Sequence, residues 1–74
     1  MKSNIESIVD KADLIVNGYA FTKCNIGYRV LNINNTQKAI VISFDGEPLE
    51  TTMDDIEMRI VLDYFKKNKK YMED

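Results

Sequence analysis

The sequence predicts an α+β fold: an N-terminal helix, a three-stranded antiparallel meander, and a long C-terminal helix packed on the sheet. Three observations support this prediction. Apolar residues recur at helical spacing near both ends of the chain, and the middle is rich in β-branched and aromatic residues. The connections carry turn-forming asparagine, glycine and aspartate. With 74 residues, the chain is expected to form one domain over positions 1–74.

The N-terminal segment has two interpretations. Ser3 and Glu6 have the spacing of a capping box, and Asn17-Gly18 suits the end of a helix. We therefore predict a helix from about Asn4 to Val16. In the alternative, Asn17-Gly18 is a tight hairpin turn between short strands at 13–16 and 19–22. The apolar residues at helical spacing are Ile5, Ile8, Val9, Ala12, Ile15 and Val16.

Strands are predicted at 19–24, 28–34 and 38–44. The turn-forming residues between the last two indicate a hairpin, and pairing Leu31 with Ile40 sets apolar against apolar. This register predicts a first face with Leu31, Ile33, Ile40, Ile42 and Phe44, and a second with Tyr28, Val30, Ala39 and Val41.

The C-terminal helix is predicted from about Met53 to Lys70, after a turn at 45–48. Thr52 and Asp55 have the spacing of a second capping box. Acidic residues gather at the start of this helix and lysines at its end, which complements the helix dipole. Asp63 precedes Lys67 by four residues, a spacing that favours an ion pair.

The apolar surface of this helix is nearly twice as wide as a surface helix needs. It divides into two stripes, of which one can pack on the sheet. The other either packs on the first helix within the monomer or meets a ligand or another protein, and we predict a second copy of the chain. The first stripe is Met53, Ile56, Ile60 and Tyr64; the second, our predicted interface, is Met58, Val61, Leu62 and Phe65.

Charge along the chain agrees with a homodimer. Six acids and no base lie between Asp45 and Glu57, whereas four lysines lie between Lys66 and Lys70. Two such helices side by side and antiparallel would bring opposite charges together. A single chain of this size also buries a small fraction of its surface, so a partner subunit would add stability.

A regulatory nucleic-acid-binding protein is the alternative function. Its contacts would come from a basic cluster, but lysines at the end of a helix are ordinary, and the net charge of −2 and pI near 5.0 argue against a basic binding surface. The residues of this alternative site are Arg59, Lys66, Lys67, Lys69 and Lys70.

Residue types argue against catalytic and metal chemistry. The chain has no histidine and a single cysteine, Cys24, so it offers neither a Cys–His pair nor an ordinary zinc site. The acids between Asp45 and Asp55 lack the spacing of a calcium-binding EF-hand loop. We predict no cofactor, no metal and no enzymatic activity, and rank a small enzyme using carboxylates third.

No apolar run approaches a membrane span and the N-terminus lacks the apolar core of a signal peptide, so we expect a cytoplasmic protein. The stretches 19–30 and 49–57, with the tail Lys69-Lys70-Tyr71, resemble a group of short uncharacterised bacterial proteins. The resemblance spans most of the chain but implies no activity or residue roles.

Overall fold

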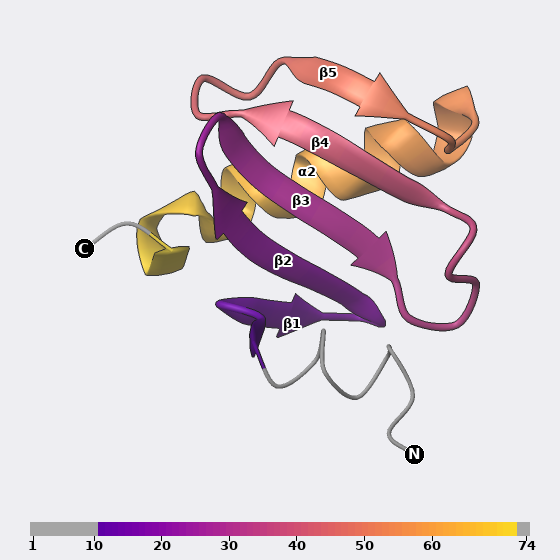
Figure 1. Ribbon diagram of the computed structural model, residues 1–74, viewed down its shortest axis with the longest axis horizontal. Helices are drawn as coiled ribbons and strands as arrows, with labels where there is room; N and C mark the ends of the chain where they lie inside the picture. Colours follow the sequence, from indigo (N-terminus) through magenta and orange to yellow (C-terminus); the bar gives the residue numbers. More distant parts are fainter. Residues whose placement is uncertain (1–10, 73–74) are drawn as a thin grey trace.

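The computed structural model describes residues 11–72, which form an antiparallel sheet followed by one helix. This arrangement confirms the predicted α+β class. The sheet is a meander in which strands that follow one another along the chain are neighbours, and the helix crosses behind it (Figure 1). The elements are β1 (Leu14–Val16), β2 (Tyr19–Cys24), β3 (Gly27–Asn32), β4 (Ala39–Ser43), β5 (Pro48–Thr51) and α2 (Asp55–Met72).

The first hairpin corrects the predicted helix from about Asn4 to Val16. Its last three residues form β1, which pairs with β2 and sets Val16 opposite Tyr19. Asn17 and Gly18 have φ angles of 47° and 85°, the two positive values that a two-residue hairpin turn requires. The hairpin alternative is therefore right for this segment. Positions 4–10 of the predicted helix lie outside the described residues.

The register of the β3–β4 hairpin differs by one residue from the prediction. Leu31 lies opposite Ala39, not opposite Ile40. The turn accounts for this difference, because the Asn32 side chain accepts a hydrogen bond from the Asn35 amide, 3.1 Å away, and closes the end of β3 early. Turn geometry, rather than the matching of apolar pairs, sets this register.

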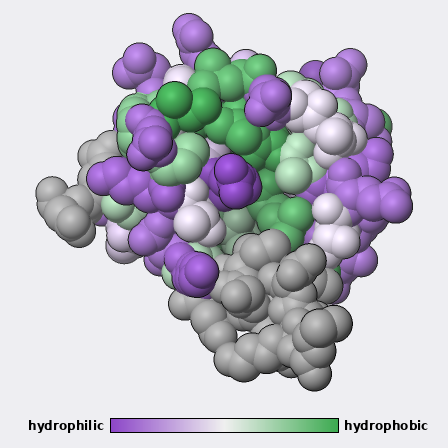
Figure 2. Space-filling model, in the orientation of Figure 1, coloured by the Kyte–Doolittle hydropathy of each residue, from purple (hydrophilic) through white to green (hydrophobic). Residues whose placement is uncertain are grey.

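The one-residue shift exchanges the predicted partners on the two faces of the hairpin, because side chains alternate along a strand. The buried face lies against α2, and the opposite face includes Arg29 at its centre strand. Figure 2 shows that opposite side, where apolar surface gathers over the upper strands. The face toward α2 carries Tyr28, Val30, Ile40 and Ile42; the other carries Arg29, Leu31, Ala39 and Val41.

The sequence prediction missed β5, which forms one edge of the sheet. Its four residues are all exposed, and a bulge at Val41/Ile42 interrupts its pairing with β4. Proline within a strand is tolerated at such an edge because its missing amide has no neighbouring strand to bond. Thr52, which follows β5, accepts a hydrogen bond from the Ala39 amide at 3.0 Å and donates to the Gln37 carbonyl at 2.6 Å.

Helix α2 confirms the predicted C-terminal helix, with a shift of two residues at each end. Asp54, not Thr52, caps it: the Asp54 carboxylate accepts a hydrogen bond from the Glu57 amide at 2.8 Å. The Thr52 hydroxyl is occupied by its bonds to the sheet. The predicted ion pair between Asp63 and Lys67 is present, with Nζ and Oδ2 2.9 Å apart.

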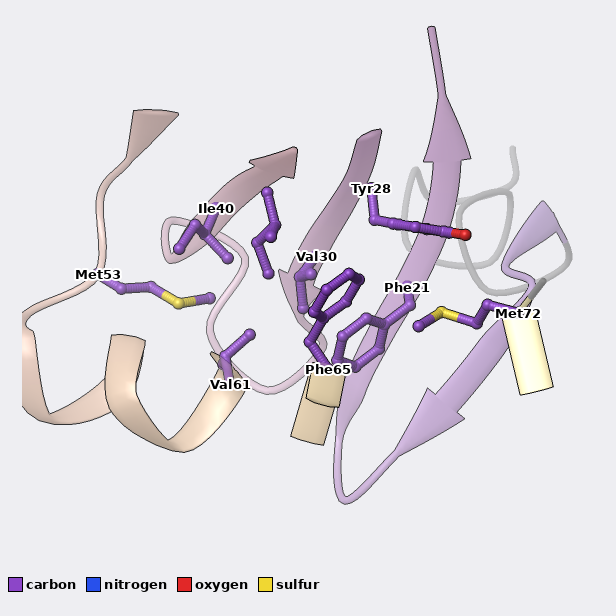
Figure 3. Close-up of a cluster of buried hydrophobic side chains, with 9 residues drawn as sticks. Phe21, Tyr28, Val30, Ile40, Met53, Val61, Phe65 and Met72 are labelled. Carbon is purple, nitrogen blue, oxygen red and sulfur yellow. The ribbon is translucent and has the colours of Figure 1, made fainter. Parts of the chain in front are cut away.

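The hydrophobic core lies between α2 and the sheet (Figure 3). The rings of Tyr28 and Phe65 approach with centroids 5.4 Å apart, which joins β3 to the helix. Gly27 permits the close approach of β3 and β4, because a Cβ atom there would lie 1.8 Å from the Ile42 carbonyl oxygen. The core residues are Phe21, Tyr28, Val30, Ile40, Ile42, Met53, Val61, Phe65 and Met72.

Candidate functional site

The side of α2 that faces the sheet contains half of the predicted interface. Val61 and Phe65 are 0% and 2% exposed and lie in the core of this chain. Met58 and Leu62 are half-buried at the edge of the same core. The predicted second stripe is therefore the stripe that packs on the sheet, and Val61 and Phe65 are accessible to a partner only if α2 leaves the sheet.

A groove runs between α2 and the β4–β5 turn, with a volume of about 810 Å³. It joins residues from both predicted sites, since Met58, Leu62 and Phe65 lie beside Arg59, Lys66 and Lys69. Three aspartates, at 45, 55 and 63, line it as well. The cations are therefore interleaved with acids, an arrangement that does not favour a polyanion such as nucleic acid.

The lysine cluster at the end of α2 is divided among different surroundings. Lys69 lies by the groove with Nζ 6.0 Å from the centre of the Phe65 ring. Lys67 pairs with Asp63, which raises the pKa of the Lys67 ammonium through the hydrogen bond between them. Lys70 Nζ lies 5.2 Å from the centre of the Tyr71 ring. These side chains do not present one common basic surface.

The flank of α2 away from the groove carries an apolar stripe that the chain leaves exposed. Ile56 is 75% exposed, Ile60 43% and Tyr71 67%, and Tyr64 is half-buried beside them. Positions 56, 60 and 64 are separated by four residues each, so their side chains follow one line along the helix. We call these four residues the exposed stripe. Its first three members belong to the first stripe of the sequence prediction.

A polar cluster fixes α2 to the sheet beside the exposed stripe. Glu57 Oε2 accepts hydrogen bonds from Tyr19 Oη at 2.7 Å and from Asn32 Nδ2 at 2.8 Å. The Tyr19 ring also lies against Tyr64, with centroids 6.0 Å apart. Burial, reinforced by the Glu57 hydrogen bond, raises the pKa of Tyr19 to about 12. The sequence offered no signal for this cluster, because its members lie 25 and 38 residues apart.

The described part of the chain contains no group of three acidic or cysteine side chains placed to hold a metal ion. Cys24 is half-buried at the end of β2. Between positions 11 and 72, no helix is long and apolar enough to cross a membrane.

Comparison with known protein families gives one match, to a family model that covers residues 2–72. The chain belongs to DUF7723, a family of unknown function. This membership agrees with the resemblance to uncharacterised proteins found in the sequence. Comparison with curated proteins and with solved structures gave no match. The family assigns no ligand or site residue, so the functional argument rests on the surface of α2.

Proposed function

We propose that this member of DUF7723 is a small homodimeric interaction module whose contact surface is the exposed stripe of α2. The observation that carries the proposal is the exposure of Ile56 and Ile60, 75% and 43%, at adjacent turns of one helix. Single exposed apolar side chains are ordinary, but a line of them along a helix is typical of a protein-binding surface.

The exposed stripe has no part in holding α2 to the sheet. The opposite side of the helix packs there through Val61 and Phe65, and Glu57 fixes the helix with two hydrogen bonds. Residues that are free of a folding role yet apolar lower their free energy by meeting another apolar surface. The proposal therefore keeps the homodimer expected from the sequence and places its contact on the neighbouring stripe.

Light scattering across a dilution series tests this proposal, with the native chain compared with Ile56→Asp and Ile60→Asp. We expect the native chain to change from dimer to monomer on dilution, and each substitution to raise the dissociation constant by at least about tenfold. Leu49→Asp is the matched control, because Leu49 is 47% exposed but lies in β5.

Circular dichroism verifies that each variant is folded before its mass is interpreted. A native chain that stays monomeric at several hundred micromolar would contradict the proposal, and so would a dimer that Ile56→Asp and Ile60→Asp leave intact. Dissociation by Leu49→Asp alone would place the contact on the sheet edge and overturn the assignment to α2.

A further inference from the structure

We infer that the two copies meet with their α2 helices antiparallel, about a two-fold axis beside the middle of the helix. This inference rests on the homodimer proposed above and names the arrangement of its partner. It commits the exposed stripe to one occupant, the same stripe on a second copy of the chain. Two features of α2 support it independently: the distribution of its charges and the symmetric placement of its exposed side chains.

The charges of α2 are separated along its length. Asp54 caps the helix and Asp55 and Glu57 lie in its first turn, whereas Lys69 and Lys70 lie in its last turn. In a parallel pair, acidic starts would meet each other and lysine-rich ends would meet each other. An antiparallel pair sets each acidic start beside a basic end, and the helix dipoles oppose as well.

The exposed side chains are placed symmetrically about the middle of α2. The helix spans Asp55–Met72, so its midpoint falls between Asp63 and Tyr64. Ile56 and Tyr71 are equally distant from that midpoint, on the same flank. A two-fold axis there sets Ile56 of one copy beside Tyr71 of the second, at both ends of the contact.

The same axis sets Ile60 beside Lys67 of the second copy. Lys67 can cover Ile60 with its methylene chain while its ammonium stays in water. Its ammonium lies 2.9 Å from Asp63, and both side chains are largely exposed, at 70% and 55%. Near the axis, the Asp63–Lys67 pairs of both copies come together with alternating charges, so no like charges are forced into contact.

The contact is small, which sets the conditions of the test. One flank of one helix buries less than the roughly 1,600 Å² of a standard protein interface. We therefore expect a micromolar dissociation constant, and the experiments require protein at about 100 μM or above.

Disulfide trapping in a Cys24→Ser background tests the arrangement. Ile56→Cys and Tyr71→Cys are made in separate chains, and each is oxidised alone and after mixing. The antiparallel arrangement predicts a cross-linked dimer in the mixture and little cross-linking of either chain alone. Leu49→Cys, exposed in β5, is the control for random collision.

A chain with Ile56→Cys that cross-links to itself would indicate a parallel pair and overturn the inference while leaving the homodimer in place. A dimer by light scattering with no cross-link in the mixture would also overturn it, since the contact would then lie elsewhere. A chain that is monomeric by light scattering fails the proposed function itself, so the two failures are distinguishable.

Salt provides a second test that changes no residue. Screening weakens contacts between opposite charges and relieves those between like charges. The antiparallel pair therefore predicts that the native dissociation constant rises, by about three- to tenfold, between 0.05 and 0.3 M sodium chloride. A dissociation constant that falls over this range would contradict the antiparallel arrangement.

Discussion

The two sides of α2 are both apolar, yet the chain treats them in opposite ways. On one side, Val61 and Phe65 are 0% and 2% exposed; on the other, Ile56 and Ile60 are 75% and 43% exposed. Hydrophobicity does not distinguish these stripes, because isoleucine is at least as apolar as valine. The difference shows that the rotation of the helix about its own axis decides which stripe is buried.

Glu57 explains this rotation. Its carboxylate accepts hydrogen bonds from Tyr19 in β2 and Asn32 at the end of β3. Turning α2 so that Ile56 and Ile60 faced the sheet would carry Glu57 away from both donors. The two bonds would be lost, and partly buried polar groups without partners destabilise a fold. The polar cluster therefore selects the stripe that packs on the sheet.

The largest expected effect is on the packed side. Phe65→Ala removes a ring that contacts Tyr28 and lies at the centre of the core, so it should lower the free energy of unfolding by about 3–5 kcal/mol. A domain of this length has a total of roughly 4–11 kcal/mol, so the variant should be close to unfolding. Urea denaturation followed by circular dichroism measures the loss. A loss below 1 kcal/mol would contradict the buried position of Phe65.

This contrast also indicates how much of the structure the sequence predicted. The α+β class, β2 and α2 follow from local patterns, since alternation, turn residues and helical spacing act over a few neighbours. The turn at Asn17-Gly18 fits a helix end and a hairpin equally well in sequence. Its φ angles of 47° and 85° belong to a hairpin, with β1 pairing on β2.

The candidate site was only partly predictable for a related reason. The sequence showed that α2 carries two apolar stripes, and one of them packs on the sheet as expected. Which one packs depends on Tyr19 and Asn32, and both lie far from Glu57 in the chain. Contacts between residues so distant leave no periodic pattern, so the predicted interface fell on the wrong side for Val61 and Phe65.

An intermediate effect is expected at the boundary between the two sides. Tyr19→Phe keeps the ring beside Tyr64 but removes the hydrogen bond to Glu57, which should cost about 1 kcal/mol at pH 7. The same variant separates a pH effect. The pKa of Tyr19 is raised to about 12 in the folded chain, from an ordinary value of 10.0.

The sign of that effect follows from proton binding. Between pH 10 and 12 the unfolded chain releases the Tyr19 proton and the folded chain retains it, so the free energy of unfolding falls as pH rises. Below pH 10 both states keep the proton and the contribution is complete. We expect Tyr19→Phe to have a shallower decline than the native chain over this range, measured by urea denaturation at several pH values. Identical slopes would show that Tyr19 titrates normally.

The smallest effect, and one of opposite sign, is expected on the exposed stripe. Ile56→Ala removes a side chain that is 75% exposed, and alanine is the better helix former. In dilute, monomeric protein, the free energy of unfolding should change by less than about 0.5 kcal/mol, in the stabilising direction. At concentrations where the native chain is a dimer, association stabilises the native protein but less so the variant. The difference between the two chains should therefore change sign with concentration in thermal unfolding. A variant that is less stable even when dilute would mean that Ile56 contributes to the fold, and the two sides of α2 would differ less than their exposure suggests.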